Sequence, residues 1–407
     1  MFPKKTVRDI DVRRKRVLVR VDYNVPLDEK GRVLDKTRIV ESLPTINYLM
    51  EQECPIVLMS HLGRPGGRPD RKFSLRPVAG ALGGLLNRKV QFVDDCIGIK
   101  VDQFARAVMP SEVLLLENLR FYEEEEKNDP LFSRALASLG RVFINDAFGS
   151  VHRAHASTVG VTQFLPSVAG FLLEREIRVL SELLLKPQRP YFAILGGAKV
   201  GDKLAVVRNL LERVDNLMIG GAMAFTFLKA QGYDVGKSLV DDRRVTEVKE
   251  ILEKYSKKIH LPLDAMAAPS KERARESQQI VFEKEKTIGD FQCLDLGEKT
   301  IAAWSEFIRK SKPKTLFWNG PLGMFEAKEF SRGTFEIAKV LGEVARNDGN
   351  VIVGGGDSIA ALAELGLTRE MTHISTGGGA SLEYLEGKTL PGIAALQDAG
   401  NKPRKKL

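Results

Sequence analysis

The stretch Tyr191-Phe-Ala-Ile-Leu-Gly-Gly-Ala-Lys-Val-Gly-Asp-Lys203 lies close to the midpoint of this 407-residue chain. Its apolar run, Tyr191–Leu195, ends at two glycines and is followed by a segment that carries Lys199 and Lys203. This pattern predicts a buried strand, a glycine turn and then the first turn of a helix. Glycines let the backbone approach a ligand closely, and the free N–H groups at a helix start attract anions.

The two lysines stand four residues apart, so on a helix they would share one face. Two ammonium groups beside a turn rich in N–H donors suit a polyphosphate. A structural strand–helix turn with solvated lysines would show the same residues, because glycine turns are common in α/β proteins. The spacing also misses the P-loop motif: Gly196 and Gly201 fit its outer glycines, but Asp202 stands where that motif needs lysine. A phosphate bound here would therefore be held by another arrangement.

Short apolar runs, glycine or polar turns and longer amphipathic stretches alternate along the whole chain. In the first half we expect strands at Arg16–Val21, Pro55–Met59, Val90–Val93, Val113–Leu116 and Val142–Ile144. In the second half we expect them at Tyr191–Leu195, Asn216–Ile219, Lys258–Leu263, Thr315–Trp318, Val351–Val353 and Thr372–Ser375. Continuous apolar strands between helical patterns are typical of parallel sheets covered on both faces. The predicted fold class is therefore α/β, with two doubly wound domains.

A charged, amphipathic segment separates the two sets of strands. Within it, apolar residues recur at helical spacing at Leu173, Ile177, Leu180 and Leu184, and prolines end the run at Pro187 and Pro190. We expect an interdomain helix over residues 172–187, between an N-terminal domain, residues 1–171, and a C-terminal domain, residues 188–387.

The composition, with 43% hydrophobic and 28% charged residues, is that of an ordinary globular protein. No apolar run is long enough to span a bilayer, and the first residues lack the apolar core of a signal peptide. Three scattered cysteines, Cys54, Cys96 and Cys293, have no metal-ligand spacing and cannot all pair. A reducing, cytoplasmic location is the simplest expectation.

The net charge of +9 invites comparison with proteins that bind nucleic acids. Residues 1–20 carry eight Lys/Arg and two Asp/Glu, and Asn401–Leu407 carries four Lys/Arg, so the two ends hold +6 and +4. The two ends together carry a charge of +10, so the rest of the chain has a net charge of −1. A body without excess positive charge argues against a general polyanion-binding surface, and we expect the basic ends to be solvated.

Ligands of open parallel sheets bind beyond the carboxyl ends of the strands, so the residues after each predicted strand are the functional candidates. In the first half these residues are Asp22, Asn24, His61, Arg64, Asn118, Arg120, Asp146, His152, Arg153 and His155. In the second half they are Gly196-Gly197, Gly220-Gly221, Asp264, Asn319-Gly320, Gly354–Asp357 and Thr376–Gly379. The first half thus offers arginine and histidine, whereas the second offers glycine turns and isolated carboxylates.

Several basic residues of the first half follow separate segments that could converge on one crevice: Arg38, His61, Arg64, Arg120 and Arg153. Guanidinium groups bind phosphate and carboxylate through paired hydrogen bonds, so several together suit a small, multiply anionic metabolite. Any one of these arginines taken alone would more often form a surface ion pair. Their recurrence at successive strand ends favours a binding site.

Other polar residues of the first half have two interpretations. Asp22 and Asn24 favour turns, yet either one can accept a hydrogen bond from a substrate hydroxyl. His152 and His155 suggest a metal site, but no third His or Cys ligand has suitable spacing. We expect the two histidines to have a structural or substrate-contacting role.

In the second half, Asp357 follows three glycines, Gly354–Gly356, at the end of an apolar run. The glycines leave the backbone open to phosphate, and the carboxylate could hold Mg²⁺ beside it. A carboxylate that caps a helix beginning at Ser358 is equally compatible with this pattern. Glu326, after a stiff loop with two glycines and a proline, could accept hydrogen bonds from a ribose. No stretch completes a dinucleotide-binding fingerprint.

Eight motifs of this chain resemble those of the phosphoglycerate kinase family. They are Arg20–Pro26, Ser60–Pro65, Glu117–Phe121, Asn145–Gly149 with His152–His155, Leu195–Lys199, Trp318–Pro321, Gly354–Asp357 and Ser375–Gly379. They occur in the family's order over nearly the whole chain, and together they are highly specific.

The resemblance implies a monomeric, hinge-bending enzyme of two Rossmann-like domains separated by a cleft. The implied reaction transfers a phosphoryl group between 1,3-bisphosphoglycerate and ADP, giving 3-phosphoglycerate and ATP, with Mg²⁺ bound to the nucleotide. These small molecules are the implied partners, without nucleic acid or membrane. Because the family's C-terminal segment folds back onto the N-terminal domain, residues 388–407 are expected there.

Matching motif positions also imply site residues. The triose substrate would lie on the N-terminal domain, against Asp22, Tyr23, Asn24, Arg38, His61, Leu62, Gly63, Arg64, Arg120 and Arg153. The nucleotide would lie on the C-terminal domain, against Gly197, Ala198, Lys199, Lys203, Asn319, Pro321, Glu326, Gly355, Gly356, Asp357 and Ser358. Asp357 would help to hold Mg²⁺. The implied catalytic groups are Arg38, Lys199, Gly356 and Gly379.

A carboxylate that attacks a γ-phosphate is already ionised at neutral pH, so the implied reaction needs no general base. It needs alignment and stabilisation of charge on the transferring group, for which Arg38 and Lys199 are the candidates. The glycine turns Gly354–Gly356 and Gly377–Gly379 would add backbone donors. Domain closure would align the substrates and exclude water.

The chain departs from the family's usual residues at four positions. Ala222 and Cys293 replace glycines that are expected near the adenine pocket, where they bear on nucleotide affinity. Ser358 replaces a threonine but keeps its hydroxyl, and Tyr23 replaces a common phenylalanine.

Two other classes of function stand beside the enzyme. The basic ends are compatible with a nucleic-acid-binding protein. The glycine turns are compatible with an inactive nucleotide-binding module, against which the retention of Arg38, Lys199, Lys203 and Asp357 argues.

Overall fold

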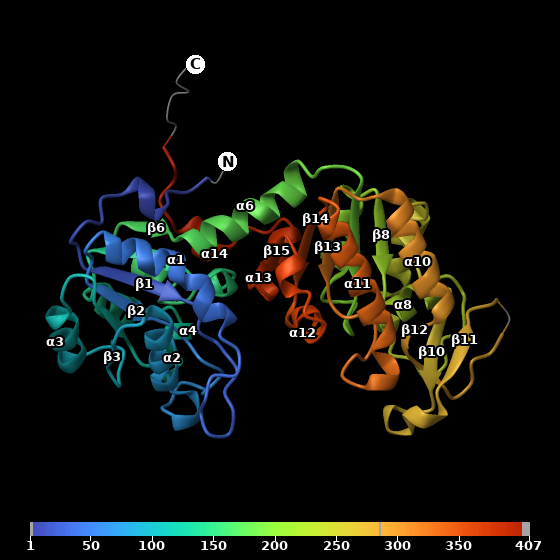
Figure 1. Ribbon diagram of the computed structural model, residues 1–407, viewed down its shortest axis with the longest axis horizontal. Coiled ribbons are helices and arrows are strands. Elements are labelled where there is room, and N and C mark those ends of the chain that lie inside the picture. Colours follow the sequence, from blue (N-terminus) through green and yellow to red (C-terminus); the bar gives the residue numbers. More distant parts are fainter. Residues whose placement is uncertain (1–2, 285, 401–407) are drawn as a thin grey trace, which may run out of the picture. The chain divides into compact units, whose positions relative to one another are not determined.

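A computed structural model describes residues 3–284 and 286–400, and within it the chain divides into two compact units (Figure 1). Within the described residues, unit 1 contains residues 3–179 and 389–400, and unit 2 contains residues 180–284 and 286–388. The basic tail, Asn401–Leu407, lies outside the described residues. None of the helices within the described residues is long and apolar enough to cross a membrane.

Unit 1 is built on a six-stranded parallel sheet with the strand order β3-β4-β2-β1-β5-β6. Its strands are β1 (Val17–Val21), β2 (Ile56–Met59), β3 (Val90–Phe92), β4 (Val113–Leu115), β5 (Val142–Asp146) and β6 (Ser167–Ala169). Its helices are α1 (Thr37–Glu51), α2 (Arg76–Leu86), α3 (Ile99–Ala107), α4 (Glu123–Glu126), α5 (Pro130–Ala137) and α14 (Pro391–Ala394). Every residue of β1, β2, β4 and β5 is buried, which confirms a parallel sheet covered on both faces.

The core of unit 1 follows from the alternation of side chains along β1. Val17, Val19 and Val21 share one face of this strand and pack in one cluster with Ile39 and Ile46 of α1. The C-terminal segment belongs to the same unit, because it hydrogen-bonds to both ends of this part of the chain. The Gln397 carbonyl accepts from the Lys5 amide at 2.8 Å, and the Gln397 amide donates to the Ser167 carbonyl at 3.0 Å.

Unit 2 is built on a second six-stranded parallel sheet, with the order β15-β14-β13-β7-β8-β9. These strands are β7 (Tyr191–Leu195), β8 (Asn216–Ile219), β9 (Ile259–His260), β13 (Thr315–Asn319), β14 (Asn350–Gly354) and β15 (His373–Ser375). Its helices are α7 (Leu204–Leu211), α8 (Met223–Ala230), α9 (Val245–Tyr255), α10 (Glu298–Ser311), α11 (Arg332–Arg346), α12 (Gly356–Glu364) and α13 (Gly379–Leu385). The expected α/β class with two parallel sheets is thus confirmed.

Unit 2 differs from the sequence predictions in three places. A small antiparallel sheet of β10 (Asp264–Ala268), β11 (Gln278–Val281) and β12 (Gln292–Leu296) was not predicted. The strand expected over Lys258–Leu263 is limited to the two residues of β9, since Pro262 lacks the N–H that a ladder needs. The helix expected directly after Gly196-Gly197 begins only at Leu204, so Lys199 and Lys203 lie in the preceding turns and do not share a helix face.

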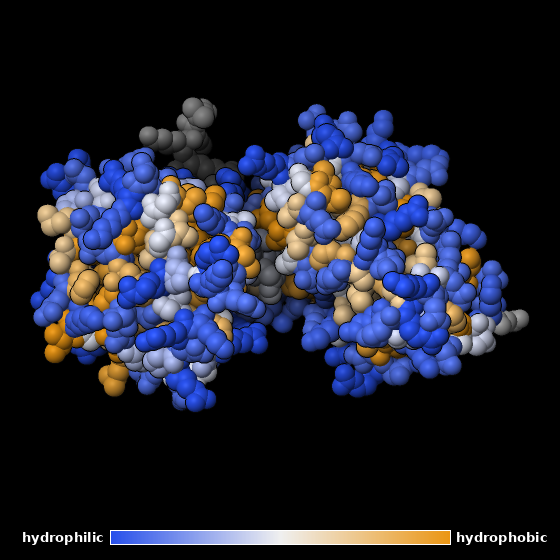
Figure 2. Space-filling model, turned by 60° about the horizontal axis from the view of Figure 1, so that its bottom comes forward, coloured by the Kyte–Doolittle hydropathy of each residue, from blue (hydrophilic) through white to orange (hydrophobic). Residues whose placement is uncertain are grey.

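The surface of both units is largely hydrophilic on the face drawn in Figure 2, with apolar residues interspersed. The exposed large apolar side chains include Ile99 on α3, Leu131 on α5 and Leu185 at the end of α6. Scattered exposure of this kind is normal for a globular protein.

Helix α6 (Phe171–Leu185) occupies the segment for which an interdomain helix was predicted. Its start is fixed by Asp146, the last residue of β5, whose Oδ1 accepts hydrogen bonds from the Leu172 amide at 2.9 Å and the Leu173 amide at 3.2 Å. Asp146 is fully buried, and this burial raises the pKa of its carboxyl to about 6, although the hydrogen bonds oppose the change. A carboxylate at a helix start is favourable, but here it also carries a cost of burial.

We expect the stability of the fold to respond to ionisation of Asp146. The folded chain binds this proton more tightly than the unfolded chain does, so raising the pH from 4 to 7 lowers the free energy of unfolding, by up to about 3 kcal/mol. The Asp146→Asn variant keeps an oxygen acceptor but lacks the ionisation. Its melting temperature should therefore rise relative to that of the wild type over this pH range.

Thermal unfolding of both proteins at several pH values measures the effect. Exposed Glu329 offers a matched control, and Glu329→Gln should track the wild type. A constant difference between wild type and Asp146→Asn from pH 4 to 7 would contradict the assignment.

Candidate active site

The carboxyl ends of β1 and β2 place Asp22 and His61 at one edge of the sheet of unit 1. Arg20 of β1 lies opposite Met59 of β2, so the residues that follow these two positions leave the sheet side by side. Asp22 forms an ion pair with Arg38 at the start of α1, with 2.5 Å between Oδ2 and Nη1. Burial acts to raise the pKa of Asp22, but Arg38, Arg20 and a hydrogen bond from the Asn24 amide oppose it, and the pKa is lowered to about 2. Asp22 is therefore a carboxylate over the physiological pH range.

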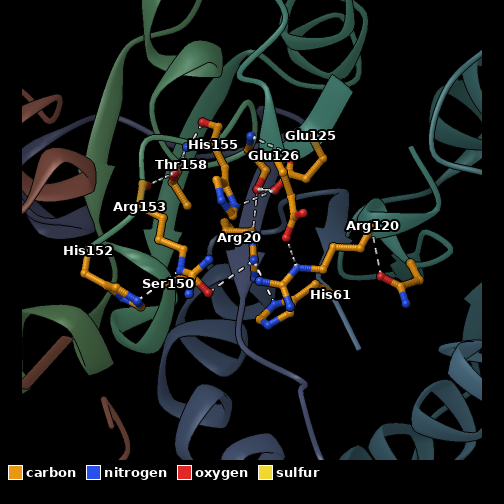
Figure 3. Close-up of polar contacts among 12 residues, drawn as sticks. Arg20, His61, Arg120, Glu125, Glu126, Ser150, His152, Arg153, His155 and Thr158 are labelled. Carbon is orange, nitrogen blue, oxygen red and sulfur yellow. Dashed lines mark hydrogen bonds and ion pairs between the residues drawn. The ribbon is translucent and has the colours of Figure 1, made fainter. Parts of the chain in front are cut away.

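His61 is held by Arg20, the second-last residue of β1, which is only 1% exposed (Figure 3). The Arg20 Nη2 lies 3.0 Å from the His61 Nδ1. A guanidinium can only donate, so Nδ1 accepts and the imidazole proton lies on Nε2. Burial, together with the neighbouring arginines, lowers the pKa of His61 well below its usual value, although Asp22 opposes this. His61 is thus a neutral hydrogen-bond donor, and Arg38 is the principal cation beside Asp22.

Arg20 belongs to a buried polar network that the sequence analysis did not identify (Figure 3). Its Nε donates to Ser157 Oγ at 2.9 Å and its Nη2 to Ser150 Oγ at 3.2 Å. Ser157 Oγ in turn donates to Glu125 Oε1 at 2.6 Å, and the Ser157 amide donates to Oε2 at 3.0 Å. The hydroxyl of Ser157 therefore links the buried guanidinium to a buried carboxylate.

The two histidines that suggested a metal lie beside this network (Figure 3). His155 is 3.8 Å from the Glu125 carboxylate, and its pKa is lowered to about 4 by burial and then by Arg20, Arg120 and Arg153. The Arg153 Nε donates to His152 Nε2 at 3.2 Å. Over residues 3–284 and 286–400 there is no group of three or more His, Cys, Asp or Glu side chains that could hold a metal ion.

Three of the predicted arginines converge. They line one cavity of about 520 Å³, whose other charged residues are Lys127 and two carboxylates; the full lining is Arg64, Gly66, Gly67, Arg120, Tyr122, Glu123, Glu126, Lys127 and Arg153. The Arg120 Nη1 donates to the Gly63 carbonyl at 2.8 Å, and its Nε lies 3.2 Å from Glu126 Oε1. Arg120 is half-buried and fixed, whereas Arg64 and Arg153 are exposed. Such an arrangement suits a small anion with more than one charge.

Some of the residues predicted for unit 1 do not present their side chains to this cavity. Tyr23 is fully buried in the core cluster, with its hydroxyl 2.9 Å from Ser42 Oγ. Leu62 is also in that core, and its amide and carbonyl are both hydrogen-bonded to Asn118. Gly63 connects the site through its backbone, because its amide donates to Asn24 Oδ1 at 2.9 Å. Tyr23 and Leu62 therefore anchor the loops of this site in the core of unit 1.

The glycine turns of unit 2 are aligned by the register of its parallel sheet. Five residues at the carboxyl ends of neighbouring strands pair across the sheet, in the order Ile219, Leu195, Asn319, Gly354 and Ser375. The turns that follow are bonded to one another. The Gly197 amide donates to the Pro321 carbonyl at 2.8 Å, and the Gly221 amide donates to the Leu322 carbonyl at 3.1 Å. The Gly320 amide donates to Ser358 Oγ at 2.7 Å.

The two lysines of the central stretch have different environments. Lys203 inserts between two turns, where its Nζ donates to the Gly196 carbonyl at 2.6 Å and lies 3.4 Å from the Asn319 carbonyl. Burial lowers the pKa of Lys203 to about 8, against the influence of Asp357. Lys199 is exposed. Lys203 therefore braces the turns, whereas Lys199 is accessible to a ligand.

A cavity of about 320 Å³ adjoins these turns within unit 2. Polar and backbone groups reach it from Gly197, Ala198, Pro321, Glu326 and Asp357, and apolar side chains from Ala222, Leu239, Cys293, Leu294 and Met324. The two positions that depart from the family pattern, Ala222 and Cys293, thus lie in the wall of one cavity.

Other predicted residues of unit 2 lie behind or beside this cavity. Asn319 and Ser358 are buried, and Asn319 Nδ2 has no hydrogen-bond partner. Gly355 precedes α12 with a φ of +93°. Gly356 and Gly379 are the exposed first residues of α12 and α13, where helix N–H groups are unpaired.

Comparison with known proteins adds a decisive observation. A sequence profile of the family described as phosphoglycerate kinase matches residues 7–388. The chain belongs to the phosphoglycerate kinase family. A phosphoglycerate kinase of Moorella thermoacetica is 51% identical over 398 residues, which cover 97% of this chain and 99% of that protein.

Solved phosphoglycerate kinase structures agree. That of Coxiella burnetii has a TM-score of 0.83 at 38% identity and covers 97% of this chain and 98% of its own. That of Pyrococcus horikoshii has a TM-score of 0.83 at 32% identity, with coverage of 96% and 98%. The expected family, fold class and reaction, a phosphoryl transfer to and from a carboxyl group, are therefore confirmed.

The environment of His61 in this phosphoglycerate kinase family member generates a prediction. We expect its imidazole to remain neutral, with the proton on Nε2, between pH 8 and pH 6, because burial and the neighbouring arginines disfavour the charged form. Nitrogen-15 NMR of the histidine side chains reports both the charge and the tautomer. The His61→Asn variant assigns the signal by its loss.

A His61 signal that titrates near pH 6.5, or a proton on Nδ1, would contradict the arrangement. The second result would also exclude the hydrogen bond from Arg20.

Proposed function

We propose that unit 1 binds the triose phosphate and unit 2 binds the nucleotide in the reversible transfer between 1,3-bisphosphoglycerate and ADP. The contrast between the two sites carries this assignment. Unit 1 offers a cavity with three guanidinium groups, which suit a small anion, whereas unit 2 offers aligned backbone turns beside a cavity with apolar walls. The first suits a phosphorylated carboxylic acid, and the second suits a base with its phosphate chain.

On unit 1, Arg64, Arg120 and Arg153 would neutralise the phosphate of the triose. The Nε2–H of neutral His61 would donate to a substrate oxygen without adding charge, and the Asp22 carboxylate would accept from a hydroxyl. Asn24, Gly63 and the backbone of Tyr23 and Leu62 would complete this site by fixing the loop. Arg38 is anchored by Asp22 and remains partly exposed, so it is available to the reacting groups.

On unit 2, the apolar wall of the smaller cavity would receive the base, and Glu326 would accept from the ribose. Gly197, Ala198 and Pro321, together with the start of α12, would hold the phosphates through backbone groups, with Asn319, Ser358 and Lys203 bracing these turns. Lys199 would contact the phosphate chain directly.

Asp357 fits the role of a Mg²⁺ ligand, because it is exposed in the first turn of α12 and lines the same cavity. Nucleotide-bound Mg²⁺ usually takes one or two carboxylates and completes its coordination with phosphates and water. When bound, the ion would neutralise charge on the phosphates.

In the direction of ATP use, a carboxylate oxygen of 3-phosphoglycerate forms a bond to the γ-phosphorus while the bond to the bridging oxygen of ADP breaks. The attacking carboxylate is already ionised, so no proton moves. Arg38, Lys199 and the backbone N–H groups at Gly356 and Gly379 would stabilise the charge on the transferring group. Because the ligands bind to different units, we propose that the transfer includes a movement that aligns them and excludes water.

The proposal extends to the setting of the enzyme. We propose a monomer that acts in the cytoplasm on small molecules and not on nucleic acid. The three cysteines are free and buried, which fits a reducing compartment.

The direct test is phosphorylation of 3-phosphoglycerate by ATP and Mg²⁺, coupled through glyceraldehyde-3-phosphate dehydrogenase to loss of NADH. Saturable activity that requires magnesium is expected. Folded protein that binds ATP without turnover would instead support an inactive nucleotide-binding module.

The Arg38→Ala variant should lose turnover by on the order of 10³-fold, because it removes a guanidinium from the transferring phosphoryl group. Its affinity for ATP should stay within about twofold of the wild type, since Arg38 lies on unit 1. Steady-state kinetics and ATP titration measure the two quantities, with exposed Arg88→Ala as the charge-matched control. A parallel loss of ATP affinity would show that Arg38 serves the nucleotide.

The Asp357→Asn variant should need a higher Mg²⁺ concentration for half-maximal activity and should bind MgATP about tenfold more weakly, which corresponds to loss of one charged ligand. Exposed Glu364→Gln removes the same charge from the far end of α12 and serves as the control. Unchanged magnesium dependence in Asp357→Asn would remove Asp357 from the metal site.

A further inference from the structure

Four arginines line a second cavity of unit 1, of about 890 Å³, at the opposite end of the sheet from Asp22 and His61. Arg16 and Arg141 immediately precede β1 and β5, Arg106 lies in the last turn of α3, and Arg134 lies in α5. The five residues of β1 separate this edge from the triose site. At a rise of ~3.3 Å per residue that separation is roughly 16 Å. The cavity is therefore distinct from the site at the carboxyl ends of the strands.

The register of the sheet brings two of these arginines together. Val17 pairs with Val142, and the Arg141 amide donates to the Arg16 carbonyl at 2.7 Å. The Arg16 side chain is fixed by two further carbonyls: its Nε donates to Leu139 at 2.9 Å and its Nη1 to Ala105 at 3.3 Å. One guanidinium is thus half-buried and held in place before any ligand arrives.

The positive charge of this cavity is not compensated by its own walls. No carboxylate is among the lining residues. Within the described parts of the chain, the side chains of Arg106, Arg134 and Arg141 form no hydrogen bond or ion pair. Burial and then Arg141 and Arg106 lower the pKa of Arg16, with only Asp102 acting against them. An anion in the cavity would remove this repulsion.

Apart from Ser138, the remaining side chains of the wall are apolar. Phe164, which is 42% exposed, lies with Leu165 and Pro166 along the cavity. A bare inorganic ion would leave these groups in contact with water, whereas an organic ligand would cover them.

We propose that this cavity binds a small organic anion with two or more phosphate groups, at a site separate from those for the triose and the nucleotide. Guanidinium groups pair with phosphate oxygens through two parallel hydrogen bonds, and three unpaired groups exceed what one carboxylate requires. The inference does not depend on the proposed function, because no residue of the cavity takes part in it.

Isothermal titration calorimetry of the full chain tests the proposal, with inorganic pyrophosphate and fructose 1,6-bisphosphate as probes. Saturating 3-phosphoglycerate in every titration occupies the triose site. The variant Arg106→Ser/Arg134→Ser/Arg141→Ser removes the unpaired guanidinium groups and retains Arg16, whose hydrogen bonds support the fold. The control Arg88→Ser/Arg275→Ser/Arg369→Ser removes the same charge from exposed positions elsewhere.

We expect the cavity variant to bind fructose 1,6-bisphosphate at least tenfold more weakly than the wild type, and the control to bind it as the wild type does. Both variants should keep wild-type turnover without added probe, which shows that they are folded. Amide NMR signals of Gly140 and Leu165 should shift when the probe binds. If both variants bind fructose 1,6-bisphosphate equally weakly, the loss of affinity comes from the lower net charge, and the proposed site is overturned. Binding of pyrophosphate alone would overturn the organic ligand and leave an adventitious ion only.

Discussion

Parallel pairing in register is the constraint on which both sites of this chain depend. Because every strand of a parallel sheet points the same way, the chain leaves all strands at one edge and returns to them at the other. In unit 2 this alignment stacks the turns after Leu195, Asn319 and Gly354 against one another. In unit 1 it gathers Asp22 and His61 at one edge, and it sets Arg16 beside Arg141 at the opposite edge. The same rule thus places an arginine-lined cavity at each end of one sheet, and each is a proposed site for an anionic ligand.

The second organising interaction is the burial of charge behind the proposed triose site. Arg20 and Glu125 are both buried and both hydrogen-bond to the hydroxyl of Ser157, so removing either one leaves a buried polar group without its partner, which is unfavourable. Glu125 holds Ser157, and Ser157 in turn holds the guanidinium of Arg20. This buried guanidinium donates to His61 Nδ1 and so fixes the tautomer of the imidazole. Of the three arginines that line the cavity, Arg120 is fixed by the Gly63 carbonyl and Glu126, whereas Arg64 and Arg153 are exposed. The cavity thus combines one fixed guanidinium with two exposed ones.

Most of the parallel strands were predictable, because runs such as Tyr191–Leu195 are continuously apolar and continuously buried. The strands of the antiparallel sheet were not, since Gln278 and Gln279 of β11 are exposed and give no apolar signal. Arg20 could have been found, because a charge inside an apolar strand has to be paired. Glu125 could not, because it is one of four consecutive glutamates, and only the packing of α4 decides which one is buried. The late start of α7 at Leu204 arises from the turn that Lys203 braces.

The close approach of the glycine turns in unit 2 limits which substitutions the chain can accept there. A Cβ atom on Gly196 would lie 2.1 Å from the Pro321 carbonyl oxygen, and one on Gly221 would lie 2.5 Å from the Gly197 nitrogen. Both neighbours are backbone atoms, so a second substitution that shortens a side chain cannot relieve the clash. Because every residue other than glycine carries a Cβ atom, any replacement at these positions collides with the same backbone atoms. We therefore expect the side chains around the cavity that adjoins these turns, such as those of Ala222 and Cys293, to tolerate substitution more readily than Gly196 and Gly221 do.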